Sequence, residues 1–405
     1  MRSIVVLALA TSLALTGCGR QQTVGRTLPT VTAPGQTQVR LAYHGSVELG
    51  RAVEAGLDLF GVDADKGLAF GQVDQGGLAA LQRAGLHPEL VAPDSRMGIR
   101  NTFDKGYRTY EQVTTQLHAW ADQHPDRMSV KSAGKAWENE REIWTTRITG
   151  PGDASKRPAV SFTANLHARE LVTVEVAMNL IQTLVEGYDK DPAIKKMLDT
   201  RVVYVAPMMN PDGHHQAEKG GDWRKNTHKF AGGTGVDLNR NFPFQWGLVG
   251  TSNSASSDIY RGPSAASEPE TQAVRDYLSS IPNLKIGMDY HSFSNLVMWP
   301  WGWTDNPPPD APMLSAIGKK LAGFNHYKPE QASELYATSG TIRDFVYGQL
   351  HVPYFTTEMG GQNDGFDPPY ARAQQIWEEN KPGALWLISI ADDPSQVTRR
   401  TGIDR

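Results

Sequence analysis

The stretch Ala159-Val-Ser-Phe-Thr-Ala-Asn-Leu-His-Ala-Arg-Glu170 leads into a long apolar segment, residues 172–188. Its first seven residues, 159–165, form a short and mostly apolar run of the length expected for a buried β-strand. Residues 172–188 have the length and composition of a buried α-helix. A buried strand that passes directly into a helix is typical of α/β folds, in which helices cover both faces of a sheet. The stretch therefore predicts a central strand of such a sheet.

Strands and helices alternate along the chain from residue 107 onward. Further strands are predicted at residues 129–134, 143–149, 202–208, 285–291 and 353–357. Further helices are predicted at residues 110–123, 192–201, 268–281, 312–327, 341–350 and 370–391. This alternation predicts an α/β fold: a three-layer α/β/α sandwich with a mixed, mostly parallel central sheet, preceded by a small α/β N-terminal domain. The segment 209–266 is too long to be a simple connection between two elements, so we expect a functional loop region there.

The chain before residue 107 divides into segments of different composition. Arg2 and an apolar run from Ile4 to Leu15 are typical of an export signal, and the run is too short to span a bilayer. Residues 38–95 combine strand and helix patterns, which predicts a compact α/β domain. The predicted organisation is a signal peptide at 1–18, a flexible tether at 19–37, the α/β domain at 38–95, a linker at 96–106, the large domain at 107–393 and a polar tail at 394–405.

Cys18 is the only cysteine and ends the segment Leu15-Thr16-Gly17-Cys18. This segment resembles a bacterial lipoprotein box, in which the cysteine is lipidated and becomes the mature N-terminus. The resemblance implies export to the cell envelope and a lipid anchor in a membrane. An ordinary signal with an incidental cysteine is the alternative. Since no second thiol exists, we expect no disulfide.

The charge balance limits the partners that this chain can have. It contains 40 basic and 44 acidic residues, with a net charge of −4 and no long run of either sign. Proteins that bind nucleic acid usually concentrate positive charge. We therefore expect no nucleic-acid partner.

Four residues with metal-binding or proton-transfer chemistry lie at the carboxyl ends of predicted strands or shortly after them. They are His167 and Glu170 in Asn-Leu-His-Ala-Arg-Glu, His291 in Asp-Tyr-His-Ser, and Glu358 in Phe-Thr-Thr-Glu. Open α/β sheets place their sites at the carboxyl ends of strands. Two imidazoles and a carboxylate are the ligand set of a catalytic zinc ion, and a further carboxylate suits a general base. The combination predicts a metallohydrolase.

Other residues offer alternatives that have to be weighed. The segment His215-Gln-Ala-Glu218 repeats the His-x-x-Glu spacing, but it lies in a Gly-rich stretch without an apolar frame, so we expect no metal there. A histidine at the end of a strand, such as His291, is often a buried residue whose ring nitrogens are hydrogen-bonded. Because His167 and Glu170 on the neighbouring strand need a third ligand, we expect His291 to bind the metal instead. Asp237 is a candidate acceptor that would orient a ligand histidine, with a turn-forming aspartate as the alternative.

Six segments occur in the order and approximate spacing of the zinc carboxypeptidases A and B, between Tyr107 and Ala391. The segments are His-Ala-Arg-Glu, Trp-Arg-Lys-Asn, Asp-Leu-Asn-Arg-Asn, Asp-Tyr-His-Ser, Tyr-x-x-Ser-Gly-Thr and Phe-Thr-Thr-Glu. The chain therefore resembles this family, in which carboxypeptidase A is a standard example of the two-histidine, one-glutamate zinc site.

The resemblance implies a role for each matching residue. The residues implied to bind one Zn²⁺ per chain are His167, Glu170 and His291, and the implied general base is Glu358. The residue implied to polarise the scissile carbonyl is Arg224, and those implied to hold the terminal carboxylate of the substrate are Asn239, Arg240 and Tyr336. Arginine suits carboxylate recognition because its guanidinium is planar and always charged. Solvated loop charge is the alternative for the two arginines.

The resemblance also implies an activity, the hydrolysis of the C-terminal peptide bond of peptides or proteins. A cell-wall peptidase that trims muropeptides on the same scaffold is an alternative, since those peptides also end in carboxylates. A catalytically dead binding module is disfavoured, because the ligands, the base and both arginines are present.

Arg343 lies seven residues after Tyr336, where the family lines its side-chain pocket. A buried arginine there implies a preference for acidic C-terminal residues, because an opposite charge relieves a costly unpaired one. The alternative is that Arg343 opens the helix at 341–350 and points to solvent.

Residues 38–95 resemble the N-terminal α/β pro-segment that many secreted members carry over the active site. The linker Ser95-Arg96-Met97-Gly98-Ile99-Arg100 offers basic cleavage points. A permanent accessory domain is the alternative.

Overall fold

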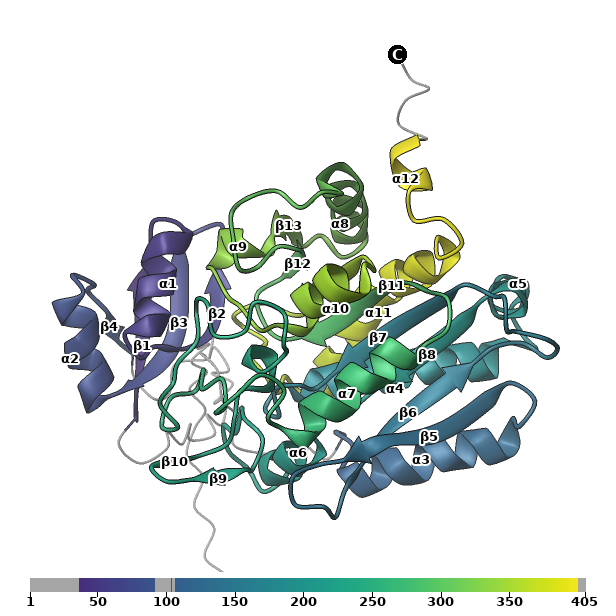
Figure 1. Ribbon diagram of the computed structural model, residues 1–405, viewed down its shortest axis with the longest axis horizontal. Helices are drawn as coiled ribbons and strands as arrows, with labels where there is room; N and C mark the ends of the chain where they lie inside the picture. Colours follow the sequence, from purple (N-terminus) through teal and green to yellow (C-terminus); the bar gives the residue numbers. More distant parts are fainter. Residues whose placement is uncertain (1–35, 92–102, 104–105, 400–405) are drawn as a thin grey trace, which may run out of the picture.

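The structure of the protein is a computed structural model that describes residues 36–91, 103 and 106–399. Two larger sheets organise the chain, a four-stranded sheet near the N-terminus and an eight-stranded sheet in the large domain (Figure 1). The small sheet has the strand order β2-β3-β1-β4, and all its neighbouring strands are antiparallel. Its domain consists of β1 (Gln36–Ala42), α1 (Ser46–Glu54), β2 (Asp58–Asp63), β3 (Leu68–Asp74), α2 (Gln75–Arg83) and β4 (Glu89–Leu90).

The large sheet has the strand order β13-β12-β14-β11-β7-β8-β6-β5. The central strands β14, β11, β7 and β8 are parallel, whereas β6 and β5 form an antiparallel edge. The strands are β5 (Met128–Lys135), β6 (Glu142–Ile148), β7 (Ala159–Ala164), β8 (Val202–Ala206), β11 (Leu284–His291), β12 (Leu296–Trp299), β13 (Lys328–Gln331) and β14 (Tyr354–Glu358). Every residue of β7 is buried, as its apolar sequence predicts for a central strand.

Helices cover both faces of this sheet and complete three layers (Figure 1). The core on one face contains side chains of α3, α4, α8 and α11, and the core on the other contains those of α7 and α10. The helices are α3 (Tyr110–Gln123), α4 (Leu171–Gly187), α5 (Pro192–Thr200), α7 (Pro269–Ser280), α8 (Ala311–Asn325), α9 (Ala332–Leu335), α10 (Ile342–Leu350), α11 (Tyr370–Ser389) and α12 (Gln396–Arg399). The predicted fold class is confirmed.

The expected loop region contains more regular structure than its composition suggests. It holds α6 (Pro211–Ala217), β9 (Lys229–Phe230), β10 (Gly233–Thr234) and a 3₁₀ turn, η1 (Leu238–Arg240). The prediction that His215 lies in a loop is therefore wrong. Asn210 caps α6, since its Oδ1 accepts from Gly213 N at 3.1 Å, and Pro211 suits the first helical turn. The sequence also failed to predict β12 and β13, which are only four residues long.

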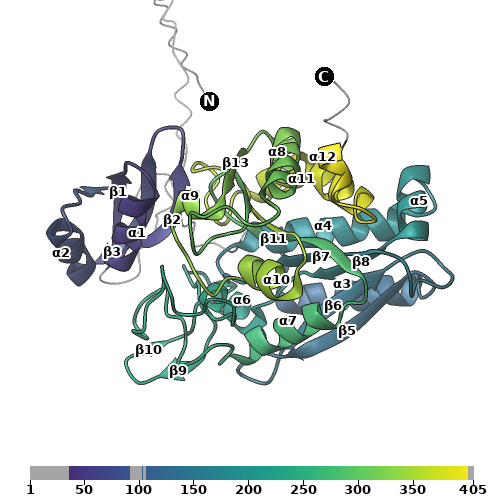
Figure 2. The ribbon, with the colours of Figure 1, turned by 45° about the horizontal axis from the view of Figure 1, so that its top comes forward.

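The small domain packs against the large one beside α9 (Figure 2), and it also contacts β12. Its apolar core includes Leu296, Met298 and Ala332 of the large domain. Phe60 of β2 forms a separate aromatic cluster with Phe293 and Phe366. The two domains therefore share apolar contacts, although they are built on separate sheets.

Several predictions concern residues outside the described ranges. The signal peptide at 1–18 with Cys18, the tether up to residue 35, and linker residues 96–102 and 104–105 belong to this group and stay predictions. The strand β1 begins at Gln36, two residues before the predicted start of the small domain at residue 38, and α12 lies within the predicted tail. Among the residues that the structure describes, no helix is both long enough and apolar enough to cross a membrane.

Candidate metal centre and its cleft

The turn after β7 brings His167 and Glu170 to the carboxyl end of the sheet. Asn165 follows the strand with a φ of 59°, a conformation that asparagine tolerates better than most residues. Its side-chain amide donates to the main-chain oxygen of His167 at 3.1 Å, which holds the turn. Glu170 then precedes α4, and its Oε1 lies 2.7 Å from Nδ1 of His167. The local sequence thus turns two potential ligands toward each other.

His291, the last residue of β11, completes the group from a neighbouring strand. Its Nδ1 lies 3.0 Å from Glu170 Oε2 and 3.1 Å from Nδ1 of His167. All three residues are buried. In a tetrahedral zinc site with bonds of about 2.0–2.1 Å, the ligand atoms are about 3.4 Å apart. Small side-chain adjustments would therefore admit the ion, and the donor set fits zinc.

Each imidazole has a carboxylate at its outer nitrogen. Nε2 of His167 lies 3.2 Å from Asp237 Oδ1, and Nε2 of His291 lies 2.6 Å from Asp289 Oδ2. Such carboxylates fix the tautomer that leaves Nδ1 free to bind a metal. The position of Asp237 agrees with its predicted role, whereas Asp289 was not predicted. The sequence did contain a signal for Asp289: it lies two residues before His291, and residues two apart in a strand have side chains on the same face.

The electrostatics of this group favour a cation. Burial by itself would lower the pKa of His291, but the carboxylates of Asp289 and Glu170 raise it well above the usual range. Burial would also raise the pKa of Glu170, but the two histidines lower it. Glu170 therefore stays ionised and stabilises positive charge between the two imidazoles.

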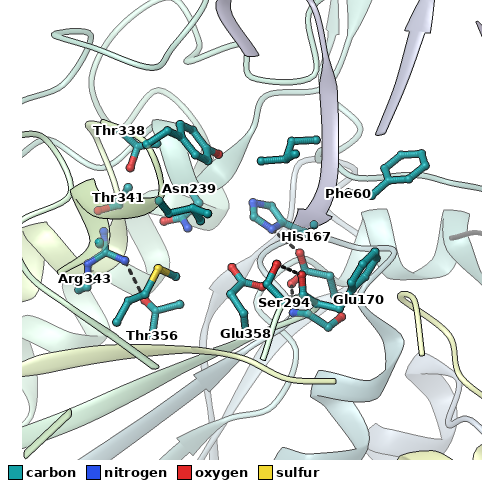
Figure 3. A pocket seen from close by; sticks show the side chains of 18 of the residues that line it. Phe60, His167, Glu170, Asn239, Ser294, Thr338, Thr341, Arg343, Thr356 and Glu358 are labelled. Atoms are coloured by element: carbon teal, nitrogen blue, oxygen red, sulfur yellow. Dashed lines mark hydrogen bonds and ion pairs between the residues drawn. The ribbon is translucent and has the colours of Figure 1, made fainter. Parts of the chain in front are cut away.

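Glu358 ends β14 directly beside His291 in the parallel register, and its side chain faces the same cavity (Figure 3). Removal from water raises the pKa of Glu358 to about 7, while His291 opposes this shift and Glu170 adds to it. A carboxyl group with a pKa near neutrality is suited to general-base catalysis.

The cavity next to the metal group contains the predicted substrate-binding side chains. Nη2 of Arg240 donates to the hydroxyl of Tyr336 at 3.0 Å. Nη2 of Arg224 donates to Asp237 Oδ2 at 2.9 Å. The Oδ1 atom of Asn239 accepts from the main-chain nitrogen of Ile342 at 3.0 Å, which orients its amide. The structure brings these predicted residues to one place, lined by His167, Glu170, Arg224, Asn239, Arg240, Tyr336, Arg343 and Glu358.

Arg343 lies in the wall of this cavity, at the start of α10 (Figure 3). Its residue is 4 % exposed, so the alternative of a solvent-facing arginine is wrong. Its Nη1 donates to Thr356 Oγ1 at 3.2 Å and its Nε to Asp344 Oδ1 at 3.3 Å. Asp344 also accepts from Gly302 N with both carboxylate oxygens, at 2.9 and 3.1 Å. Asp344 is therefore shared between Arg343 and the main chain.

The strand β2 of the small domain forms part of the same cavity wall, through Leu59, Phe60 and Gly61. Beside it, Arg169 forms two hydrogen bonds with the carboxylate of Asp58, at 2.7 and 2.8 Å. Arg169 was not predicted, although its position between the two ligands in His-Ala-Arg-Glu was a signal. The small domain is thus held against the cleft by a buried ion pair.

The second His-x-x-Glu pair lies elsewhere, on α6 and its C-terminal cap. Nδ1 of His215 is 3.0 Å from Glu218 Oε2, and the carboxylate of Glu111 approaches the same group. Oε1 of Glu218 accepts from the main-chain nitrogen of Tyr110 at 2.7 Å. This pair therefore links α6 to the start of α3.

Comparison with known proteins agrees with the architecture and with the donor set. Residues 113–383 match the family model described as zinc carboxypeptidase. A zinc carboxypeptidase of Saccharothrix mutabilis subsp. capreolus is 29 % identical over 384 residues, which cover 87 % of this chain and 88 % of that protein. Carboxypeptidase A2 of Mus musculus is 32 % identical over 71 % of this chain and 70 % of its own.

Solved structures show the same fold. Carboxypeptidase A from Helicoverpa armigera superposes with a TM-score of 0.76 at 24 % identity, covering 90 % of this chain and 98 % of its own. The thrombin activatable fibrinolysis inhibitor superposes with a TM-score of 0.72 at 21 % identity, covering 89 % of this chain and all of its own. Both alignments extend beyond the 271 residues of the family match, so the likeness includes part of the small domain.

Proposed function

Since the chain belongs to the zinc carboxypeptidase family, we propose how the residues of its cleft share the hydrolysis of a C-terminal peptide bond. The protein is a metallocarboxypeptidase and its cofactor is zinc. The observation that carries the proposal is the buried group of His167, Glu170 and His291: Glu358 pairs with His291 in the sheet and lines the same cavity as His167 and Glu170.

We assign zinc binding to the two Nδ1 atoms and to the carboxylate of Glu170. Zinc held by these residues would polarise a carbonyl group and lower the pKa of a water molecule. Glu358 takes a proton from the water whose oxygen bonds to the carbonyl carbon, and it returns that proton to the amine nitrogen as the carbon–nitrogen bond breaks. Arg224, next to the metal group, stabilises the negative charge that develops on the carbonyl oxygen.

Recognition of the free carboxylate falls to the other polar residues of the cavity. Arg240 offers a planar fork of donors, and the hydroxyl of Tyr336 already lies 3.0 Å from its Nη2. Asn239 adds an oriented amide. A substrate whose terminal carboxylate is amidated would lose the charge-assisted contact, which distinguishes an exopeptidase from an endopeptidase.

Activity measurements test this proposal directly. Purified protein, cut in its linker by limited trypsin treatment, should release the last residue from N-blocked dipeptides. A chelator should abolish the release, and added zinc should restore it. The same dipeptides with a C-terminal amide should stay intact. Muropeptides serve as a second substrate set: preferential cleavage of these over ordinary peptides would support the cell-wall alternative. Binding of peptides without any hydrolysis would support the dead module.

We further propose a preference for acidic C-terminal residues, set by Arg343. Its guanidinium is buried in the cavity wall, and its contacts with Thr356 and Asp344 use only Nη1 and Nε. Among the described residues these contacts leave Nη2 available to a ligand. A carboxylate side chain of a substrate would complete the set of partners, whereas an apolar side chain would leave a buried charge incompletely paired.

Comparison of substrates that end in Glu, Phe or Arg tests this preference. We expect the parent to favour Glu, and Arg343→Ala to lose about tenfold to a hundredfold in kcat/KM on Glu, the value of one charge-assisted hydrogen bond. The loss on Phe should be much smaller. Arg275→Ala, on the surface of α7, is the control variant. A parent that prefers Phe would refute the assignment.

We also propose that residues 38–95 inhibit the uncut chain. Three residues of β2 occupy the wall of the cleft, and the pair between Asp58 and Arg169 holds them there. Limited trypsin treatment near residues 96–100 should raise activity as the fragment appears. Asp58→Asn should raise the activity of the uncut chain, whereas Asp63→Asn, at the other end of β2, where the carboxylate pairs with Lys66, should not. Full activity of the intact parent would support a permanent accessory domain.

Export and lipid anchoring at Cys18 stay a proposal that rests on the sequence alone. Expression of the full chain with a labelled fatty acid tests it. We expect label in the parent and none in Cys18→Ser; label in neither would support the ordinary export signal.

A further inference from the structure

Asp289 and His291 occupy one face of β11, together with Gly287 two residues earlier. Nε2 of His291 lies 2.6 Å from Oδ2 of Asp289. A neutral imidazole carries one N–H, so a hydrogen bond to this carboxylate places the proton on Nε2 and directs the Nδ1 lone pair to the ligand group. Asp289 is fully buried, so this contact is not weakened by solvent.

The other oxygen of Asp289 is held by a chain of hydroxyl groups inside the sheet. Oγ1 of Thr163 donates to Asp289 Oδ1 at 2.7 Å. Because that bond uses its single proton, Thr163 accepts from the hydroxyl of Tyr354, 3.0 Å away. Tyr354 in turn accepts from Ser161 Oγ at 3.2 Å. Every hydroxyl donates once, and all the donations run toward the carboxylate.

The backbone is built to admit this chain. Gly287 pairs with Tyr354 on β14 and with Ser161 on β7. A Cβ atom at Gly287 would lie 2.1 Å from Cε2 of Tyr354, so only glycine leaves room for the phenol ring. Ser161, Thr163 and Tyr354 are all fully buried. An aligned chain of hydrogen bonds in such a dry environment strengthens each of its members.

We propose that Asp289 is a positioning residue for the metal centre, and that Ser161, Tyr354 and Thr163 form a hydrogen-bond relay that orients it. Through Nε2 of His291 the carboxylate makes Nδ1 a stronger and better-aligned donor. The relay therefore tightens metal binding from behind the ligand. This inference rests on the proposed ligand role of His291.

Zinc affinity, measured by competition with a chromophoric chelator, tests the relay without any assay of activity. Asp289→Asn should bind zinc about 10–100-fold more weakly, the usual effect of removing a carboxylate behind a ligand histidine. Thr163→Val and Tyr354→Phe should weaken binding progressively less, in the order of their distance from Asp289. Thr146→Val removes an equally buried hydroxyl from β6, outside the relay, and should leave zinc affinity unchanged.

Two further measurements separate positioning from simple loss of stability. Thermal unfolding of the metal-free variants reports the fold, and the visible spectrum of the Co²⁺-substituted protein reports the donor geometry. We expect the Co²⁺ spectrum of Asp289→Asn to change while the fold persists. If Asp289→Asn does not fold, Thr163→Val decides the question. The inference would be overturned if Asp289→Asn, or Thr163→Val where Asp289→Asn does not fold, bound zinc within twofold of the parental affinity.

His291→Ala distinguishes this inference from the proposed function. If His291→Ala loses zinc and Asp289→Asn does not, only the relay is wrong. If His291→Ala retains zinc with parental affinity, the ligand assignment itself is wrong and the relay falls with it.

Discussion

The chain contains His-x-x-Glu twice, and the two copies make nearly the same local contact. Nδ1 lies 2.7 Å from the carboxylate in the first pair, His167 and Glu170, and 3.0 Å in the second, His215 and Glu218. The side chains of the first pair are 5 % and 3 % exposed, and those of the second are 30 % and 10 % exposed. Spacing alone therefore produces a histidine–glutamate contact, and it does not by itself produce a catalytic site.

The partners that each pair acquires from distant parts of the chain make the difference. The first pair receives a second imidazole from β11, a general base from β14 and the carboxylate of Asp237 behind one ring. The second receives the exposed carboxylate of Glu111 and a main-chain N–H at the start of α3. Both groups bring three potential ligands close together, but only the first is fully buried beside a general base, which suits it to binding and using a cation. The second is partly exposed and joins two helices.

Removal of either histidine should separate the two pairs most clearly. We expect His167→Ala to lose stoichiometric zinc and to fall to the activity of the chelated parent, because one of three ligands is gone. His215→Ala, the matched control, should keep one zinc ion per chain and activity within about twofold of the parent, as expected for a substitution outside the site. Metal analysis and peptide hydrolysis measure both. Equal losses in the two variants would contradict the comparison.

Replacement of the general base should have the next largest effect. Glu358→Gln should lower kcat by about 10²–10⁴-fold, the usual contribution of a positioned acid–base group, and should retain zinc. Glu218→Gln makes the same chemical change in the second region and should leave kcat unchanged. Activity of Glu358→Gln above a tenth of the parental value would refute the assignment of the base.

The pH dependence of kcat/KM should depend on the first region only. Glu358 must be ionised to accept a proton, so activity is present above its pKa and lost as the pH falls through it. The pKa of about 7 holds for the metal-free cleft, and a bound cation shifts it downward. We therefore expect an acidic limb below pH 7, with about a tenfold loss per pH unit at its foot. Glu218→Gln should show the acidic limb at the same pH as the parent. An acidic limb at a different pH would show that the second pair contributes to the pH dependence of catalysis.

The smallest expected effect concerns stability. His215→Ala should lower the free energy of unfolding of the zinc-free protein by less than about 1 kcal/mol, because the pair is partly exposed. Urea denaturation measures this quantity. Saturating zinc, at about 1,000 times its dissociation constant, should stabilise the parent by roughly 4 kcal/mol and should not stabilise His167→Ala. A loss above 3 kcal/mol in His215→Ala would show that the second pair is a structural centre.

Much of the architecture could be predicted because it depends on local periodicity. The apolar run of β7 and the helical periodicity of α3 are each compatible with few other secondary structures. The predicted bounds of both elements agree with the observed ones to within one residue. The strand β13 was missed because Lys328–Gln331 has no apolar alternation and forms only by pairing with β12 at the edge of the sheet. The helix α6 was missed because its glycine and histidines obscure the signal of its Asn-Pro start.

The sequence by itself determined the fold class, the zinc-binding residue types and their order along the chain, since these follow from periodicity and from motifs of a few residues. Only the tertiary structure decided which partners meet. It paired Arg169 with Asp58 across two domains, buried Arg343 in the wall of the cleft and placed Asp289 behind His291 at the end of a hydroxyl chain. The physical reason is that the pair Arg169–Asp58 joins residues 111 apart and the hydroxyl chain joins residues up to 193 apart, as Ser161 and Tyr354 are. Such proximity arises only when the sheet has assembled.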